Sequence, residues 1–427
     1  MPDRRDFMKS ATLAGLSLGL PGSARLPRDL KIRPLPAADD PDYWSRLRSQ
    51  FPMPPEEAYC NTGTLGAPPV RVLRAMIDHI TRYALEIAHC DWSDGGIHLL
   101  SGYFPYVDLR KKIGRLIHAD YKNIALTQNA TMGMNFLAAG LDLPEGAEIL
   151  TTDKEHSGGR SGWQLLARRR GTIWREVPIP VPADEPGQIL SAFEKAVGPK
   201  TRILSFPHIT SGTGTILPVR ELCQLARARG LLSIVDGAQA VGHVPVDVQD
   251  IGCDAYYSSP HKWLLAPAGT GILYIHERCI DSVWTTIASG NWDNHEDNGF
   301  RLTQRGTGNA ALMVGLEAAV DFHFAVGPER IRRRIKQLGD RLREGLAGIP
   351  RTKILTPLHP ELSAGLTTFN VAEMKGKDLQ DELWKRGKLQ PRAQGGKRGV
   401  RFSTHIYNSA DEVDRALAIV AELSRSG

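Results

Sequence analysis

The stretch from Leu231 to Ile275 constrains the fold more than any other part of the sequence. It contains three short apolar runs bounded by turn signals, at Leu231–Val235, Cys253–Ser259 and Gly271–Ile275. Such runs are typical of buried strands. Asp236 follows the first run and Lys262 follows the second, 262 − 236 = 26 residues later. Because ligands bind beyond the carboxyl ends of strands in an open α/β sheet, we expect both side chains at one site.

A lysine and an aspartate at strand ends allow two interpretations. In the functional one, Lys262 forms a Schiff base with an aldehyde cofactor and Asp236 keeps a pyridine nitrogen protonated, the two groups that pyridoxal phosphate (PLP) needs. In the structural one, Asp236 begins a turn and Lys262 is a solvated surface residue. The spacing alone favours the structural interpretation, because short motifs match by chance.

The wider sequence around these residues changes that balance. VDGAQA at 235–240, followed by S-x-H-K-W at 259–263 and an apolar strand, resembles the cofactor site of class V aminotransferase-fold enzymes. That group includes cysteine desulfurases, kynureninases and isopenicillin N epimerases, and HKWLLAPAGTGILY looks closest to the epimerase-like branch. The resemblance implies PLP as cofactor and a fold-type-I α/β architecture. We therefore expect a large, mainly parallel seven-stranded sheet domain and a smaller α+β C-terminal domain.

The segment Gln128–Asn135 supplies the expected phosphate loop. Its small and hydroxyl side chains follow a short strand and precede an apolar helix. Free backbone N–H groups and the positive end of a helix dipole favour an anion there, although Asn129 or Thr131 would equally cap an ordinary helix. The segment resembles the family's A-T-E-x-x-N loop, with Met132 where glutamate is common. This implies phosphate contacts by Ala130 and Thr131.

The resemblance places the other cofactor residues in family order. His156, just past the expected strand Glu148–Thr152, would stack on the cofactor ring. Ser211 and Gln239 would bind the phenolic oxygen, with Ser211 replacing the asparagine usual in desulfurases. The remaining implied contacts are Ser259, His261 and Thr307 at the phosphate, Lys262 in the covalent link and Asp236 at the ring nitrogen.

Two further motifs imply how substrate and a second subunit are bound. Arg401 begins the R-x-S-x-x-x-Y-N sequence 401–408, and its planar guanidinium would clamp a substrate carboxylate bidentately. Asn61 begins a polar loop that lies by the active site in the family. Thr307 belongs to an R-G-T segment that reaches into the neighbouring subunit, so the resemblance implies a homodimer.

The reaction is less constrained than the cofactor. Lys262, His156 and Asp236 are the expected catalytic residues, and they imply chemistry at the α-carbon of an amino acid. Residues 354–400 contain no cysteine, whereas desulfurases carry a nucleophilic cysteine there. An epimerase-like reaction is our first choice, with a C–S lyase or an aminotransferase as alternatives. A non-catalytic binding module is disfavoured, because such a scaffold needs neither Asp236 nor Lys262.

The amino terminus resembles a twin-arginine export signal. Arg4 and Arg5 precede a mild apolar stretch, Ala11–Leu20, and a small-residue end. The stretch is too short to span a membrane. We therefore expect a signal at 1–24, the twin-arginine machinery as a partner and a periplasmic or exported protein. The expected remainder is a linker and arm at 25–58, a large PLP-binding domain at 59–325 and a small domain at 326–427.

Composition excludes other classes. With 41% hydrophobic and 23% charged residues the chain is ordinary globular. A net charge of +6 without an aromatic-interleaved basic stripe gives no reason to expect nucleic acid. The five cysteines lack metal-binding or disulfide spacing, so we expect no metal. Between the expected helices Val70–Ala88 and Val107–His118, the aromatic and glycine-rich segment Asp91–Tyr106 predicts an irregular loop.

Overall fold

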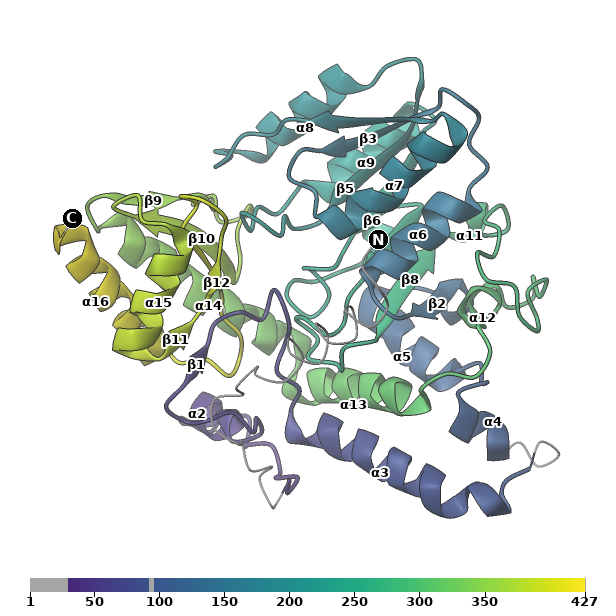
Figure 1. Ribbon diagram of the computed structural model, residues 1–427, viewed down its shortest axis with the longest axis horizontal. Coiled ribbons are helices and arrows are strands. Elements are labelled where there is room, and N and C mark those ends of the chain that lie inside the picture. The colour runs from purple at the N-terminus through teal and green to yellow at the C-terminus, as the bar shows by residue number, and fades with distance from the viewer. Residues whose placement is uncertain (1–29, 92–95, 427) are drawn as a thin grey trace, which may run out of the picture.

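A seven-stranded sheet forms the centre of the larger domain (Figure 1). The computed structural model describes residues 30–91 and 96–426. The strand order is β2-β8-β7-β6-β5-β3-β4, and only β8 runs antiparallel to its neighbours. The predicted mainly parallel seven-stranded sheet is thus confirmed. The strands are β2 (Ile124–Thr127), β3 (Glu148–Thr152), β4 (Ile173–Val177), β5 (Thr201–Pro207), β6 (Leu232–Asp236), β7 (Ala255–Ser258) and β8 (Gly271–Ile275).

Successive strand residues point to opposite sides of the sheet, and both sides carry apolar side chains. Helices cover both faces and bury these side chains. Ile149 and Tyr257 belong to one buried cluster, whereas their neighbours Leu150 and Tyr256 belong to the other. The first cluster packs against α6 (Ala130–Gly140), α7 (Ser157–Arg170), α11 (Glu277–Ile280) and α12 (Asn298–Thr303). The second packs against α3 (Val70–Glu86), α5 (Val107–Ile117), α8 (Pro186–Ala196), α9 (Val219–Ala228), α10 (Val248–Ile251) and α13 (Ala310–Val326).

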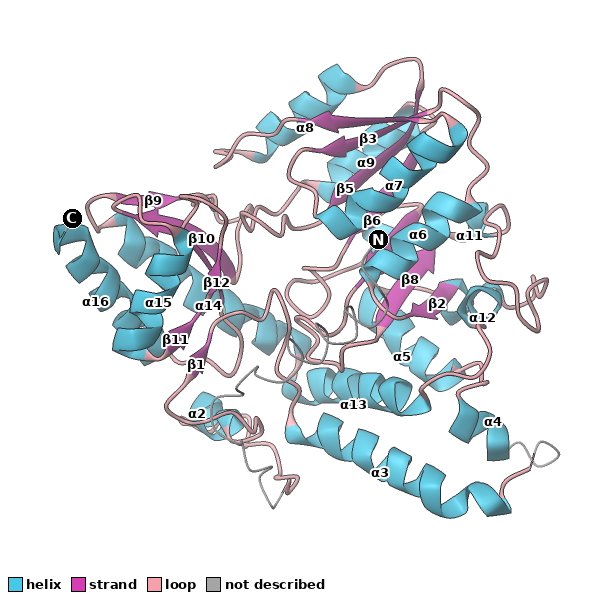
Figure 2. Cartoon of the chain, in the orientation of Figure 1, coloured by secondary structure: helices cyan, strands magenta, loops and turns pink. Residues whose placement is uncertain are grey.

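The smaller domain is α+β, as expected (Figure 2). Its antiparallel sheet has the order β12-β13-β10-β9, and its helices pack on one side of it. A short additional pair joins β1 (Ala58–Tyr59) in parallel to β11 (Leu389–Gln390). The elements are α14 (Pro328–Ala347), β9 (Thr352–Ile354), β10 (Leu366–Val371), α15 (Gly376–Gly387), β11, β12 (Arg392–Ala393), β13 (Val400–Ser403) and α16 (Ala410–Ser426).

The domain boundaries differ from the prediction at the amino-terminal end. The chain bends by 81° between α13 and α14, next to the predicted boundary at 325/326. Yet β1 pairs within the small domain, whereas the prediction began the large domain at residue 59. A two-residue strand whose partner lies more than 300 residues away leaves no periodic signal in the sequence.

The predicted arm is a packed part of the molecule. It contains α2 (Tyr43–Arg48), and its side chains Tyr43, Leu47 and Phe51 lie in one cluster with Trp263 and Tyr407. Burying side chains of this size contributes about 1.5–3 kcal/mol each. The arm therefore fastens the two domains together.

The predicted irregular loop Asp91–Tyr106 is wrong in one part, where α4 (Gly96–Ser101) forms. Two 3₁₀ turns, Ile87–His89 and Tyr121–Asn123, complete the secondary structure of the described ranges. Within these ranges no single helix is long and apolar enough to cross a membrane, and α13 and α14 meet that criterion only together, across their bend. No cluster of three or more potential metal ligands occurs among the described residues.

Candidate active site

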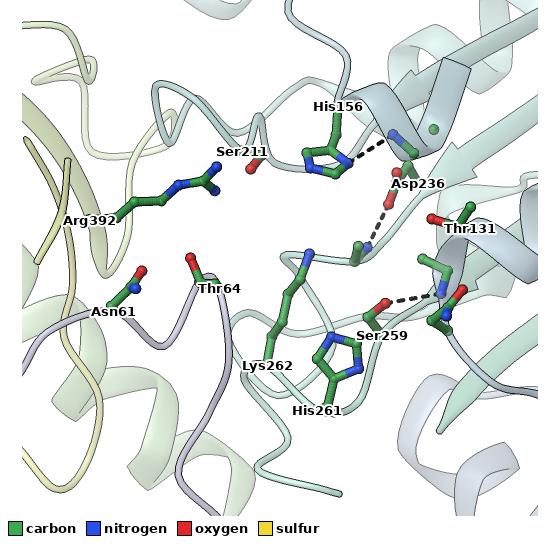
Figure 3. A pocket seen from close by; sticks show the side chains of 16 residues that line it. Asn61, Thr64, Thr131, His156, Ser211, Asp236, Ser259, His261, Lys262 and Arg392 are labelled. Atoms are coloured by element: carbon green, nitrogen blue, oxygen red, sulfur yellow. Dashed lines mark hydrogen bonds between the residues drawn. The ribbon is translucent and has the colours of Figure 1, made fainter. Parts of the chain in front are cut away.

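A cavity of about 480 Å³ lies at the carboxyl ends of the sheet strands (Figure 3). The segments after β2, β3, β5, β6 and β7 line it, together with the loop after β1 and with β12 of the small domain. The cavity is thus built where an α/β sheet binds ligands. Its lining residues are Asn61, Gly63, Thr64, Asn129, Ala130, Thr131, His156, Gly158, Gly159, Ser211, Asp236, Ala238, Ser259, His261, Lys262 and Arg392.

Lys262 extends into this cavity from the turn after β7 (Figure 3). Among the described residues nothing accepts a hydrogen bond from its Nζ. Burial lowers the pKa of this amine to about 8, against an opposing effect of Asp236 and with a further lowering by Arg401. The uncharged, nucleophilic form of the amine is therefore far more populated near neutral pH than in a free lysine.

Asp236 lies at the end of β6, almost completely buried. Its Oδ1 accepts a hydrogen bond from the Ala238 backbone N–H at 2.8 Å. Burial raises the pKa of this carboxyl, whereas the Lys262 charge lowers it. A buried carboxylate facing an open cavity is suited to a cationic N–H group, which would compensate its lost hydration.

A second carboxyl, Glu155, stands beside Asp236. Its Oε1 accepts the His156 backbone N–H at 2.6 Å, while its buried Oε2 has no hydrogen-bond partner. Burial, and then the Asp236 charge, raise the pKa of Glu155 well above its usual range. Glu155 therefore keeps its proton to higher pH than a free glutamate does.

His156 presents a neutral imidazole to the cavity. It caps α7, and its Nδ1 accepts the Gly158 backbone N–H at 3.0 Å, as Figure 3 shows. Burial and the Lys262 charge lower the pKa of this ring to about 4. The ring orientation is thus fixed by its own helix, as a flat stacking surface requires.

Hydroxyl groups and the N-terminus of α6 line another part of the cavity. Ser259 Oγ accepts the Ala130 backbone N–H at 2.9 Å, which leaves its own proton free to donate. Asn129 caps α6 through the Met132 N–H. Thr131 lies in the first turn, and a Cβ on Gly158 would stand 2.5 Å from its Oγ1. The absence of that carbon keeps the space beside the helix N-terminus open for an anion.

His261 also lines this end. Its buried Nδ1 has no hydrogen-bond partner, and burial lowers the pKa of the ring to about 4. The unpartnered nitrogen is an orphaned polar group that a ligand would satisfy.

Arg401 lies behind the small-domain side of the cavity, fully buried and without a carboxylate partner among the described residues. Its Nη1 donates to Ser211 O at 2.9 Å, and its Nη2 donates to Thr64 Oγ1 at 2.8 Å and to Asn61 Oδ1 at 3.2 Å. Its Nε has no partner, and burial lowers the pKa of the guanidinium to about 9. A buried, uncompensated cation is suited to a carboxylate ligand.

Two expected cofactor contacts lie elsewhere. The Gln239 amide is engaged at both ends, because Nε2 donates to Gly63 O at 2.8 Å and Oε1 accepts Trp263 Nε1–H at 2.7 Å. Gln239 therefore lies behind the cavity wall. Thr307 lines a separate cavity of about 390 Å³ beyond α12. The other predicted residues line the cavity or, as with Arg401, directly contact its lining.

Sequence reasoning missed several residues of the site. Thr64 lies in the same polar loop as Asn61, the one residue of that loop predicted as part of the site. The Thr64 hydroxyl contacts Arg401, which is more than 300 residues away in the sequence, so this contact could not be predicted from the local sequence. Glu155 precedes His156 and could have been noticed as an adjacent carboxyl. Arg392 lines the cavity from β12, and no sequence signal distinguishes it among 53 lysines and arginines.

The arrangement fits PLP. The orphaned His261 nitrogen, the open space above Thr131, the buried Asp236 carboxyl and the unpaired Lys262 amine meet around one cavity. Thr131, Ser259 and His261 would hold the phosphate, Asp236 the pyridine nitrogen and His156 the ring face. Lys262 would bind the aldehyde carbon.

Comparisons with known proteins agree with this geometry. Residues 67–416 match the family model described as Aminotransferase class-V. The isopenicillin N epimerase of Amycolatopsis lactamdurans is 33% identical over 405 residues, which cover 90% of this chain and 99% of that protein. That of Streptomyces clavuligerus is 32% identical, covering 87% and 96%. A probable cysteine desulfurase of Pyrococcus abyssi is 28% identical, covering 89% and 97%.

Solved structures give the same picture. A variant of the enzyme C-DES with glycine covalently linked to its PLP cofactor superposes with a TM-score of 0.78 at 27% identity, covering 88% of this chain and 99% of that one. The complex of the cystine C–S lyase C-DES with cysteine persulfide gives a TM-score of 0.77 at 27% identity, covering 88% and 100%.

Proposed function

We propose that this chain, which belongs to the class V aminotransferase family and is a PLP-dependent enzyme, inverts the α-carbon of an α-amino acid. The observation that carries the proposal is the position of Lys262 in the cavity, with Arg401 buried directly behind the small-domain wall and bonded to the lining residues Thr64 and Ser211. An amine with a lowered pKa, near a buried guanidinium that has no carboxylate partner among the described residues, is suited to a substrate that carries an α-proton next to a carboxylate.

Each side chain has a distinct part in this reaction. PLP, when bound, withdraws electrons from the α-carbon and so acidifies its proton. Arg401 would hold the α-carboxylate, and this orients the α-C–H bond toward Lys262 Nζ, which exchanges the proton on one face of the α-carbon. Inversion also requires a proton donor on the opposite face, a role that none of the residues named above takes. Asp236 balances the charge of the pyridine nitrogen, and His156 covers the ring face and excludes water.

The proposal of inversion rests on the relatives and on the lining of the cavity. The two isopenicillin N epimerases, at 33% and 32% identity, match this chain over 90% and 87% of its length. The described lining contains no thiol, and the small-domain segment 354–400 has no cysteine. A persulfide-forming nucleophile is therefore missing from the site.

Exchange in heavy water tests the proposal. A substrate should gain deuterium at its α-carbon and appear in both configurations, as measured by NMR and chiral chromatography. Lys262→Ala should lose both the exchange and the borohydride-reducible link to the cofactor, while its circular dichroism stays native. Exchange with retained configuration would overturn inversion.

A C–S lyase is the second candidate, because the C-DES structures match most of the chain. Stoichiometric release of pyruvate from cystine, without inversion, would establish it. Accumulation of the amine form of the cofactor would indicate an aminotransferase instead.

A homodimer is part of the proposal. Along α3 four large apolar side chains, those of Ile77, Ile80, Tyr83 and Leu85, are 42–73% exposed. The neighbouring segment carries Thr307 away from the cavity of its own subunit. A second copy placed against α3 would cover the apolar face and bring Thr307 toward the partner's phosphate.

Export completes the proposal. Residues 1–24, which lie outside the described residues, resemble a twin-arginine signal, and that route carries folded proteins. A PLP enzyme loaded before crossing would suit it.

A further inference from the structure

The turn that carries Lys262 has a strained backbone. It follows β7, and Leu265 closes it with a φ of 60°, in the left-handed region that a residue with a Cβ rarely adopts. The hydrogen bond from Leu265 N–H to Lys262 O is long, at 3.3 Å. Such a conformation persists only where the surrounding structure holds it in place. The position of the Lys262 amine therefore depends on what packs against this turn.

The polar loop after β1 packs against one side of the turn. Gly66 N–H donates to His261 O at 2.7 Å, and a Cβ on Gly66 would stand 2.0 Å from Lys262 O. The same loop also holds Arg401, whose Nη2 donates to Thr64 Oγ1 at 2.8 Å. Thr64 and Lys262 line one cavity from these two segments (Figure 3). The loop therefore joins the two groups that the proposed reaction needs.

Trp263 connects the turn to the same loop by a second route. Its Nε1–H donates to Gln239 Oε1 at 2.7 Å, and Gln239 Nε2 donates to Gly63 O at 2.8 Å. An indole nitrogen can only donate and a backbone carbonyl can only accept, so this chain fixes the orientation of the amide between them. Because both side chains are almost completely buried, water cannot replace either hydrogen bond if it is lost.

Two histidines hold the indole ring of Trp263 in a single orientation. The His243 ring stacks on it, with the ring centroids 3.6 Å apart and an interplanar angle of 8°. His243 Nε2 accepts the Gly365 N–H, so the proton of this ring lies on Nδ1, which donates to Gln239 O at 2.9 Å. His405 Nε2 donates to Trp263 O, also at 2.9 Å. Burial lowers the pKa of both imidazoles to about 3, so both stay uncharged near neutral pH and above.

We propose that Trp263 is a positioning residue, which through Gln239 fixes the Lys262 amine relative to the loop after β1. This inference rests on the proposed function, because that loop holds Arg401, which is taken to bind the substrate carboxylate. Trp263 does not line the cavity, so it acts only through its neighbours. Without the indole N–H, the strained turn keeps its contact with Gly66 alone, and the amine moves toward water.

Trp263→Phe removes the indole N–H but keeps an aromatic ring against the two histidines. The absorbance of the PLP-loaded enzyme reports the protonation of the nitrogen that Lys262 contributes to the cofactor link. The pH midpoint of this change should rise by about one unit, because burial lowers the pKa of the Lys262 nitrogen and the variant admits water. Gln239→Leu, which leaves the stacked rings untouched, breaks the same chain and should give an equal rise. The double variant should shift the midpoint no further, because the chain is broken only once.

Trp163→Phe is the matched control, since Trp163 is equally buried but its Nε1 donates to Ser205 Oγ on β5, at 3.2 Å. It should leave the midpoint in place. An unchanged midpoint in Trp263→Phe, an equal shift in Trp163→Phe, or additive shifts in the double variant overturns the inference. Failure of the proposed function is distinguishable: none of the common L-amino acids gains α-deuterium in heavy water with the native enzyme, yet Trp263→Phe still shifts the midpoint.

Discussion

At the scale of the residue, the charge state of Lys262 is set by groups that act in opposite directions. Burial, Arg401 and Arg392 lower the pKa of the amine, whereas Asp236 and Glu155 raise it. The balance leaves it at about 8, more than two units below a free lysine. Desolvation and neighbouring cations thereby prepare the amine for attack on an aldehyde.

This balance predicts how cofactor-free protein captures PLP as pH changes. The capture rate should rise with pH through about 8, because only the unprotonated amine reacts. Arg401 lowers the pKa, so Arg401→Gln should raise it and move the profile to higher pH, as followed by stopped-flow absorbance. Arg202→Gln, at the opposite end of β5, removes an equal charge and should leave the profile in place. An unshifted profile in Arg401→Gln would contradict this account.

At the scale of the element, the start of α7 connects sheet and site. His156 caps the helix while facing the cavity, and Gly159 in its first turn approaches two carboxyls. A Cβ on Gly159 would stand 2.7 Å from Glu155 Oε1 and 2.8 Å from Asp236 Oδ2. The helix can approach β6 this closely only because that carbon is absent.

Gly159→Ala should therefore weaken PLP binding by about tenfold or more, because it displaces the Asp236 carboxyl and leaves a buried group poorly paired. Equilibrium titration of cofactor absorbance measures the loss. Gly198→Ala is a suitable control, since no atom lies within 4 Å of its added carbon. Equal cofactor affinities in the two variants would refute the role given to this close approach.

The elements also show how far sequence reasoning reaches. β3 was predicted at Glu148–Thr152 with correct bounds, because its apolar run ends in clear turn signals. α4 was missed because Gly96 and the surrounding aromatic residues suggest irregular structure. Lys262, Asp236 and His156 could be predicted because each follows a strand. Arg392 could not, since its position depends on pairing with Arg401 across the small sheet.

At the scale of the whole molecule, the proposed dimer completes the cofactor site. Thr307 lies beside the exposed apolar residues of α3, in cavities separate from that of Lys262. In a symmetric dimer each subunit would provide this residue to the other. The site would then combine side chains from two chains.

Mixed dimers test this sharing. Thr307→Ala should retain PLP about tenfold less tightly, since one phosphate hydrogen bond is lost. Co-refolding it with Lys262→Ala should restore tight, borohydride-reducible PLP, because each mixed dimer has one site with both residues intact. No restoration would place Thr307 outside the partner's site. If the native chain sediments as a monomer, the proposed dimer and the sharing of Thr307 are both wrong.

The proposed export route is tested in cells. Replacing both Arg4 and Arg5 with lysine should retain the protein in the cytoplasm, still with PLP bound, as measured by fractionation and cofactor absorbance. Arg28→Lys, beyond the signal-like segment, serves as control. Unchanged distribution of the double variant would refute the twin-arginine interpretation.

The pairing of β1 with β11 has a consequence for the order of events during synthesis. Ala58 pairs with Leu389, 389 − 58 = 331 positions later. At about 5–20 residues per second, β1 waits roughly 15–70 s on the ribosome for its partner strand. The loop that begins at Asn61, with its contacts to Arg401, cannot take its final place earlier. The nascent chain therefore acquires its substrate-binding end only when translation is nearly finished.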